Sequence, residues 1–251
     1  MNEAAAWAIL LGGVGAIIGS FLAALVIRWP AGRSVSRGRS RCDHCDAPVR
    51  ARDLVPVLSY AVLRGRCREC GAAIDPRHPA IELASLAVGV VAGLVAPGWS
   101  GVAGAVFGWL LIALAMLDLA VFWLPDRLTG TLAIIGLAGG GAGLDPPMAD
   151  RLIGGVAGFG LLWATARAYR LVRHRDGLGG GDPKLLGAIG LWLGWRTLPA
   201  VLLVGCLIGL GFVLLQRLRG RTMARDAAMP LGTLLAIAAY PAWVFMISMA
   251  S

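Results

Sequence analysis

The chain has 251 residues, of which 58% are hydrophobic and 15% charged, and its formal net charge is +9. So few charged side chains cannot cover a water-exposed surface, which excludes an ordinary soluble domain. The basic residues cluster between apolar segments, a pattern that favours attraction to anionic lipid at a cytoplasmic face over nucleic-acid binding. We therefore expect a membrane protein with several spans.

Apolar segments recur along the whole chain and predict an all-α polytopic membrane protein with about eight transmembrane helices. A helix needs about 20 residues to cross a bilayer, and most of the segments approach or exceed that length. The fourth and sixth segments are the shortest. The eight predicted helices cover residues 4–27, 79–96, 102–124, 128–144, 152–172, 184–195, 198–215 and 230–249.

The distribution of arginine predicts the orientation of these helices. Residues 28–78 carry eleven arginines against five acids, and arginines also cluster around 173–175 and 217–225. The alternate loops, such as 97–100, are nearly bare or acidic. Because basic loops stay on the cytoplasmic side, we expect the insert 28–78 to be cytoplasmic and both termini to lie outside.

Four cysteines in the polar insert form two CxxC pairs that are separated by 21 residues: Cys42, Cys45, Cys67 and Cys70. This pattern is typical of tetrahedral zinc, and four thiolates would fill the coordination shell, so the zinc would be structural. The alternative is metal-free cysteines, either reduced or disulfide-paired, although a cytoplasmic loop disfavours disulfides. Other residues of metal-binding type are expected as solvated loop residues or as a buried packing residue: His44 and His78, and Cys206.

Two aspartates at membrane depth are the main candidates for a functional site, since an intramembrane acid is costly. Asp118 lies about two turns inside the cytoplasmic end of segment 102–124. Asp182 follows three glycines and precedes Pro183, which predicts that it caps the next helix. The glycines leave room for another backbone. The topology places both acids on the cytoplasmic side, so we expect them to face each other.

Two crowded carboxylates titrate as a unit and can share one proton. Such a pair can activate a water and protonate a leaving group, as in aspartic proteases. The residues alone leave a proton-coupled transporter or assembly factor equally open, and a zinc-ribbon scaffold without chemistry is a third interpretation. Asp126 is expected to cap segment 128–144. Glu82 is expected to be a first-turn acid favoured by the helix dipole, with a substrate or cofactor role as the alternative.

The chain resembles the prepilin leader peptidases, bifunctional membrane enzymes of type IV pilus and type II secretion systems. The resemblance spans nearly the whole chain. Asp118, followed by Leu124-Pro125-Asp126, matches the family's first catalytic aspartate and its Leu-Pro-Asp. Gly179-Gly180-Gly181-Asp182, with Lys184, is similar to the GxGD signature. The other matching motifs are Gly19-Ser20-Phe21-Leu22, the paired CxxC insert and Pro79-Ala80-Ile81-Glu82-Leu83.

The resemblance implies an intramembrane aspartic endopeptidase of the bacterial inner membrane, with Asp118 and Asp182 as its catalytic residues. Its substrates would be prepilins or pseudopilins, which lose their basic leader at the cytoplasmic face. N-methylation with S-adenosylmethionine would follow. The supporting motif residues would be Gly179, Gly181, Lys184, Pro125 and Asp126, and Glu82 would be a possible methyltransferase or substrate contact.

The chain is expected to divide into three parts. Residues 1–28 would form the first transmembrane helix, 29–78 the zinc-binding insert and 79–251 the peptidase core. The family's opening motif usually continues with Asn after Gly-Ser-Phe-Leu, whereas Ala23 stands at that position. The methyltransferase activity is therefore less firmly implied than the peptidase activity.

Overall fold

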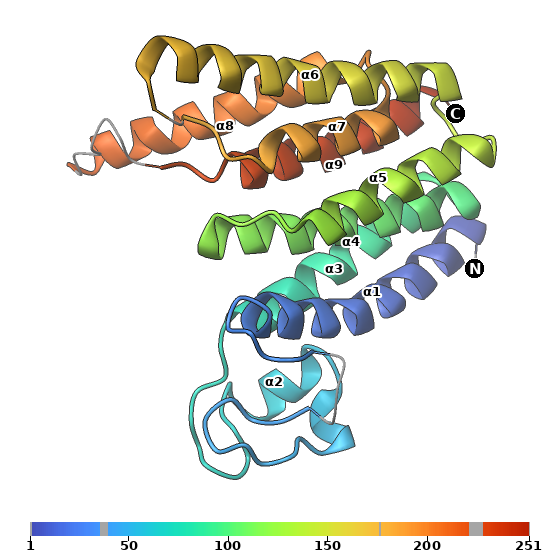
Figure 1. Cartoon of the computed structure of the whole chain (residues 1–251). Coiled ribbons are helices and arrows are strands. Elements are labelled where there is room, and N and C mark those ends of the chain that lie inside the picture. The colour runs from blue at the N-terminus through green and yellow to red at the C-terminus, as the bar shows by residue number, and fades with distance from the viewer. Residues whose placement is uncertain (1, 36–39, 176, 221–227, 251) are drawn as a thin grey trace. The chain divides into compact units, whose positions relative to one another are not determined.

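The computed structural model describes residues 2–35, 40–175, 177–220 and 228–250, and within these ranges it contains helices and no strand. The all-α prediction is confirmed, since each of the eight predicted segments forms a helix (Figure 1). The insert adds a short 3₁₀ helix, Ala51–Leu54, and α2, Leu58–Val62. The long helices are α1 (Glu3–Arg28), α3 (Arg77–Val95), α4 (Trp99–Val121), α5 (Asp126–Gly141), α6 (Met148–Arg173), α7 (Asp182–Leu193), α8 (Leu198–Leu218) and α9 (Leu231–Ala250).

Five of these helices are long and apolar enough to cross a membrane: α1, α3, α4, α8 and α9. Helices α5 and α7 have 16 and 12 residues, which is short of the roughly 20 that a span needs. Helix α6 has 26 residues, but Arg151 lies in its first half and several arginines in its last turns. Eight crossing helices therefore stay a prediction, whereas a polytopic membrane protein is established.

The chain forms two compact units, Met1–Ala113 and Leu114–Ser251, which divide inside α4. In the first unit α1 packs along α3 through small residues, and a Cβ at Gly89 would overlap the Leu11 carbonyl. The indole of Trp109 donates a hydrogen bond of 2.9 Å to the Ser85 carbonyl. The division into a zinc-binding insert and a peptidase core at residue 79 is a hypothesis about function and is separate from these units.

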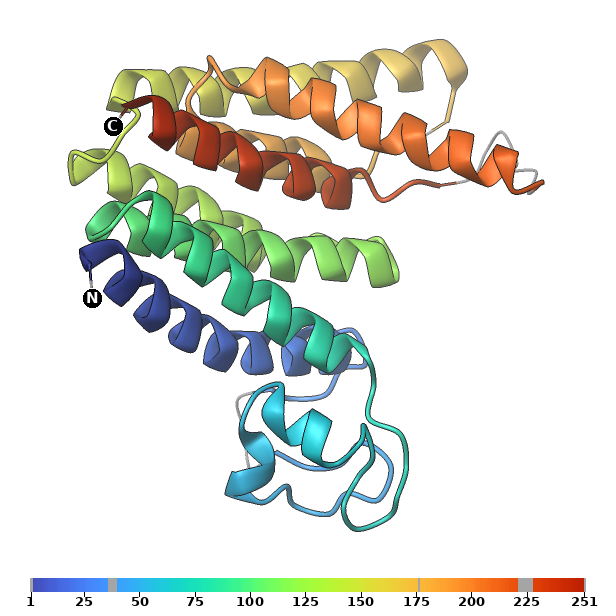
Figure 2. The same cartoon turned by 180° about the vertical axis from the view of Figure 1, so that it is seen from behind.

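In the second unit α7 is the central helix. It contacts α5, α6, α8 and α9, which surround it in Figures 1 and 2, and ten of its twelve residues are buried. A Cβ at Gly190 would overlap the Gly154 carbonyl, so the glycines allow α6 and α7 to touch backbone to backbone. A helix this short can lie among the longer ones because protein, rather than lipid, covers ten of its twelve residues.

Arg151 joins three elements of the second unit, although the predicted helices 128–144 and 152–172 left it in the loop between them. Its side chain is only 2% exposed. All five guanidinium N–H groups donate to backbone carbonyls at 2.6 to 3.1 Å. The acceptors lie in α5, in the α5–α6 loop and in α7: Gly136, Leu144, Asp145, Pro146 and Leu191.

We expect Arg151→Lys to destabilise the second unit. Lysine has three donors, so at least two buried carbonyls would lose their partner at about 1–3 kcal/mol each. The apparent thermal midpoint in detergent should fall by about 10 °C. Arg167→Lys, on an exposed position of the same helix, is the matched control and should shift the midpoint by less than about 2 °C. Equal midpoints for the two variants would show that the carbonyl cage is not stabilising.

Candidate functional site

Asp118 lies in the last turn of α4 and is buried. The helix ends at Val121 and not at Leu124, so the predicted depth of two turns is wrong. Phe122 has a left-handed backbone (φ 52°), which ends the helix there. The Asp118 carboxylate oxygen Oδ2 accepts hydrogen bonds from the backbone N–H of Thr233 (2.7 Å) and from its hydroxyl (3.1 Å). Helix α9 therefore holds this carboxylate from a point 115 residues away in the sequence.

The Thr233 hydroxyl has two partners for one proton. Its Oγ1 lies 3.1 Å from Asp118 Oδ2 and 2.9 Å from the carbonyl of Ala115. A hydroxyl can donate to a carboxylate, or donate to a carbonyl while it accepts from a protonated carboxyl group. Thr233 is therefore a suitable partner for Asp118 in either protonation state.

Asp182 is the first residue of α7, and Gly181 occupies the cap position without a side-chain cap bond. The prediction that Asp182 caps this helix is wrong by one residue, because the Leu185 amide donates to the Gly181 carbonyl (2.9 Å) and so includes Asp182 in the helix. The carboxylate instead turns back toward the preceding loop, where Oδ2 accepts from the Gly179 N–H at 3.1 Å. Asp182 is buried at this position.

The glycines before Asp182 differ in what surrounds them. A Cβ at Gly181 would lie 2.7 Å from the Cβ of Leu124, and one at Gly179 would lie 2.9 Å from Asp182 Oδ2. A Cβ at Gly180 would meet nothing within 4 Å. A side chain at the third glycine would therefore clash with Leu124, one at the first would displace the Asp182 carboxylate, and the middle position is free, which is the spacing of a GxGD pattern.

The structure brings Asp118 and Asp182 together in one pocket of about 510 Å³. Gly232, next to Thr233, borders the Asp118 carboxylate, since a Cβ at Gly232 would lie 3.1 Å from Asp118 Oδ2. The pocket wall is otherwise apolar or glycine-rich. It consists of Phe122, Trp123, Leu124, Gly177, Leu178, Gly179, Gly180, Gly181, Ala228, Met229 and Leu231.

Lys184 and Asp126 form an ion pair at the edge of this site. Asp126 is the first residue of α5, with Pro125 in the cap position, so its expected capping role is wrong. Lys184 Nζ lies 2.6 Å from Asp126 Oδ1 and thereby joins the first turns of α5 and α7. The side chains are 46% and 74% exposed, so solvent screening limits the pair to at most about 1 kcal/mol. Its effect is to align the two helix starts.

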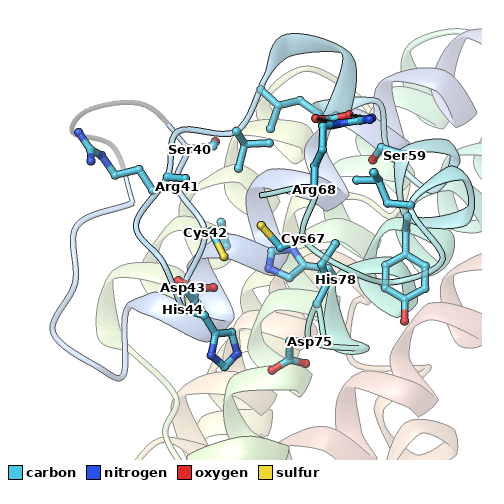
Figure 3. Close-up of a pocket in the computed structure, with 18 of the residues that line it drawn as sticks. Ser40, Arg41, Cys42, Asp43, His44, Ser59, Cys67, Arg68, Asp75 and His78 are labelled. Carbon is cyan, nitrogen blue, oxygen red and sulfur yellow. Dashed lines mark hydrogen bonds and ion pairs between the residues drawn. The ribbon is translucent and has the colours of Figure 1, made fainter. Parts of the chain in front are cut away.

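The four insert cysteines form a cluster whose sulfur atoms all lie within 4.8 Å of one another. All four are free thiols, and Cys42 Sγ lies 3.9 Å from Cys70 Sγ. Metal–sulfur bonds of 2.3 Å in a tetrahedron require sulfur atoms about 3.8 Å apart. The cluster therefore fits a tetrahedral four-thiolate metal ion. Figure 3 shows the sulfur atoms of Cys42 and Cys67 facing each other.

The cysteine pairs lie on two copies of one turn, which explains why they converge. In both copies the amide of the first cysteine donates to the carbonyl five residues later, and an isolated bridge closes the turn. The residue four positions after that cysteine is left-handed in both: Asp46 (φ 56°) and Gly71 (φ 72°). Beside the second copy, Arg68 donates two hydrogen bonds to Asp53 and holds the pKa of that carboxyl below its usual range.

Glu82 has a different place from the one that the sequence predicted. Helix α3 begins at Arg77, so Glu82 lies beyond its first turn and the expected dipole role is wrong. The residue is only 7% exposed, and its Oε2 accepts a 2.7 Å hydrogen bond from the Val57 amide. Val57 has φ 62°, a left-handed value that is rare for a β-branched residue. Such backbone strain is often found at functional sites, so a function of this segment is a hypothesis. His78, expected in a loop, lies in α3 one turn earlier and is half-buried.

These features define a class: a polytopic helical membrane protein with a paired-carboxylate pocket in one unit and a four-cysteine cluster in the other. Residues 14–95 match the Bacterial Peptidase A24 N-terminal domain. Residues 105–214 match the Type IV leader peptidase family. The chain belongs to the type IV leader peptidase family.

Similar proteins named prepilin leader peptidase/N-methyltransferase occur in several bacteria. The chain is 41% identical to the protein of Aeromonas salmonicida over 207 residues, 80% of this chain and 69% of the relative. It is 42% identical to that of Burkholderia pseudomallei over 211 residues, 82% of this chain and 67% of the relative. For Dickeya chrysanthemi the identity is 37% over 247 residues, 88% of this chain and 87% of the relative. No solved structure matches the chain significantly.

The cysteine geometry predicts about one bound metal ion per purified chain, measurable by elemental mass spectrometry. Cys67→Ser breaks the four-thiolate set and should lower the metal content several-fold, since a site with three thiolates loses one of its bonds. Cys206→Ser is the matched control. Cys206 is exposed on α8, contrary to the expected packing role, and lies outside the cluster. Metal content that is the same in both variants would contradict a cysteine site.

Proposed function

We propose that the chain removes the basic leader from prepilins or pseudopilins at the cytoplasmic face of the inner membrane and then methylates the new N-terminus. Family membership and the names of the relatives support this activity. The observation that carries the proposal is the single pocket that Asp118 and Asp182 both line.

The proposed hydrolysis uses the two carboxylates as one acid–base unit. The ionised carboxylate takes a proton from a water whose oxygen attacks the scissile carbonyl carbon. The protonated partner gives its proton to the leaving nitrogen as the carbon–nitrogen bond breaks. Hydrogen bonds from Thr233 to Asp118 and from Gly179 to Asp182 hold the two groups in position.

The pocket wall suits the proposed substrate. Phe122, Trp123, Leu124 and Leu231 offer an apolar surface to the hydrophobic segment of a prepilin, while the glycine loop leaves space beside Asp182 for its backbone. The arginine-rich loops support a cytoplasmic position for this end of the helices, where the leader would remain in water. Membrane lipid is the expected surroundings of the other helices.

The proposed cofactors have different roles. The four thiolates suit Zn²⁺, which they would enclose completely, so the metal would stabilise the insert and take no part in hydrolysis. S-adenosylmethionine would supply the methyl group that the new N-terminal amine receives.

Asp118→Asn and Asp182→Asn should each lower leader removal by at least about 1,000-fold, because each variant deprives the pair of its acid or its base. Cleavage of a co-expressed prepilin is read by mass spectrometry. Asp145→Asn, on an exposed position of the α5–α6 loop, is the matched control and should cleave normally. Normal processing by either site variant would end the proposal and leave the transporter or scaffold hypotheses.

Thr233→Val should lower kcat/KM for leader removal about tenfold, because the Asp118 carboxylate loses one charge-assisted hydrogen bond and keeps the one from the backbone. Thr233→Ser retains the hydroxyl and should retain most of the activity. Both variants should reach the membrane in equal amounts. If serine and valine were equally impaired, the methyl group of Thr233, and not its hydroxyl, would be the important feature.

A further inference from the structure

The polar insert carries an exposed apolar surface that the proposed function does not use. Four large apolar side chains of the 3₁₀ helix, α2 and the turn between them are 43% to 70% exposed: Leu54, Val55, Leu58 and Val62. We call these four side chains the α2 face. An exposed apolar cluster on a polar part of a protein marks a surface that contacts something other than water.

Helix α2 has its polar and apolar sides reversed for a helix in water. Its inner side, with Ser59, Tyr60 and Leu63, is half-buried and lines a cavity of about 440 Å³ beside the cysteine turns. Figure 3 shows Ser59 at the wall of this cavity. Leu58 and Val62 lie one turn apart on the outer side and are exposed. An apolar outer side is typical of a helix that lies against lipid or protein.

The backbone before α2 is fixed in the conformation that presents this face. Val57 has a left-handed backbone, and its amide donates a hydrogen bond of 2.7 Å to Glu82 Oε2 in α3. Glu82 is buried, so the start of α2 is tied to the side of a long helix. Strained backbone persists only where its surroundings hold it. The exposed position of Leu58 is therefore built into the fold.

The insert is attached to α1 and α3 inside their ends and not beyond them. Glu82 lies five residues after the start of α3 at Arg77, which is about 8 Å along the helix. Ser20, which also lines the cavity, lies eight residues before the end of α1 at Arg28, or about 12 Å inside it. Helix α2 lies in the part of the insert nearest to α1 (Figures 1 and 2). The headgroup layer of a bilayer is roughly 5–8 Å thick, so these contacts place α2 near the boundary of headgroups and hydrocarbon.

The surroundings of the α2 face also suit a membrane surface. On the two long helices, Phe21 and Leu83 adjoin the attachment residues in the sequence and are both 50% exposed, so apolar surface continues at this level. Arg52 and Arg64 flank the α2 face, are exposed, and have no ion-pair partner in the described part of the chain. Apolar side chains framed by basic ones are typical of segments that lie in the interface of an anionic membrane.

We propose that the α2 face docks into the cytoplasmic leaflet of the membrane. Its four apolar side chains enter the layer where headgroups meet acyl chains, and Arg52 and Arg64 bind the phosphate groups of anionic lipids. The insert is thereby held against the bilayer beside α1 and α3. This docking depends neither on the proposed hydrolysis nor on the proposed methylation.

Two protein occupants of the α2 face fit less well than lipid. A prepilin would bring a basic leader, which Arg52 and Arg64 would repel. A second copy of the chain that used the same face would bring its own pair of arginines against this pair. Lipid phosphate carries the opposite charge and avoids both difficulties.

Photocrosslinking in a bilayer is the first test. Full-length protein with Val62→p-benzoylphenylalanine is reconstituted into nanodiscs of phosphatidylcholine and phosphatidylglycerol and irradiated, and intact mass spectrometry measures the lipid adduct. The matched control is Glu69→p-benzoylphenylalanine, at an exposed position of the second cysteine turn and outside the α2 face. The probe at Val62 should give several-fold more lipid adduct than the probe at Glu69. Equal adducts, or an adduct at Val62 to a second copy or to a co-expressed prepilin in place of lipid, would overturn the proposal.

Lipid charge and face polarity provide the second test, with the probe kept at Val62. Nanodiscs of phosphatidylcholine alone should give several-fold less adduct, and the double variant Arg52→Gln, Arg64→Gln should no longer respond to phosphatidylglycerol. Leu58→Asp should lower the adduct several-fold in either lipid, since a charged side chain opposes insertion. Metal content and thermal midpoints identify any variant that fails to fold. An adduct that none of these changes lowers in folded protein would show that the face does not dock.

Discussion

Hydrocarbon offers no hydrogen-bond partners, so a polar side chain among these helices is costly unless the protein itself satisfies it. Arg151 meets this demand with five carbonyls, and Asp118 and Asp182 meet it with backbone amides from α9 and the glycine loop. These bonds join distant parts of the chain. The same contacts that make the polar groups tolerable therefore fix the geometry of the carboxylate pocket.

The central position of α7 follows from this constraint. A helix of twelve residues cannot span a bilayer alone, and its open N-terminus carries Asp182. Four neighbouring helices cover it, and backbone contact with α6 at Gly154 and Gly190 leaves no lipid between them. The aspartate is thereby buried at the end of a helix, beside a loop of small residues that lines the pocket.

Local patterns predicted the helices, the cysteine cluster and the glycine spacing, because each depends on residues close in the sequence. Long-range partners were not predictable. Nothing in the sequence near Arg151 shows that Leu191 will accept from it, and nothing near Glu82 indicates Val57. The capping predictions for Asp182 and Asp126 were wrong for a related reason. The Asp182 carboxylate accepts from the Gly179 amide and the Asp126 carboxylate from the Lys184 ammonium, both outside the helix of the aspartate. The residue before each aspartate therefore occupies the cap position.

The two carboxylates differ in how they are held, and this difference bears on their roles. Asp118 is bound by α9 through two groups of Thr233, so its movement requires that both hydrogen bonds break or that α9 moves with it. Asp182 is bound by Gly179 within its own loop, next to Gly180, where space is free. In the proposed hydrolysis, a substrate backbone that enters beside this loop would replace the Gly179 bond without unpacking a helix. Asp118 would then be the fixed member of the pair, and Asp182 the member whose contacts adjust as a peptide bond is positioned between them.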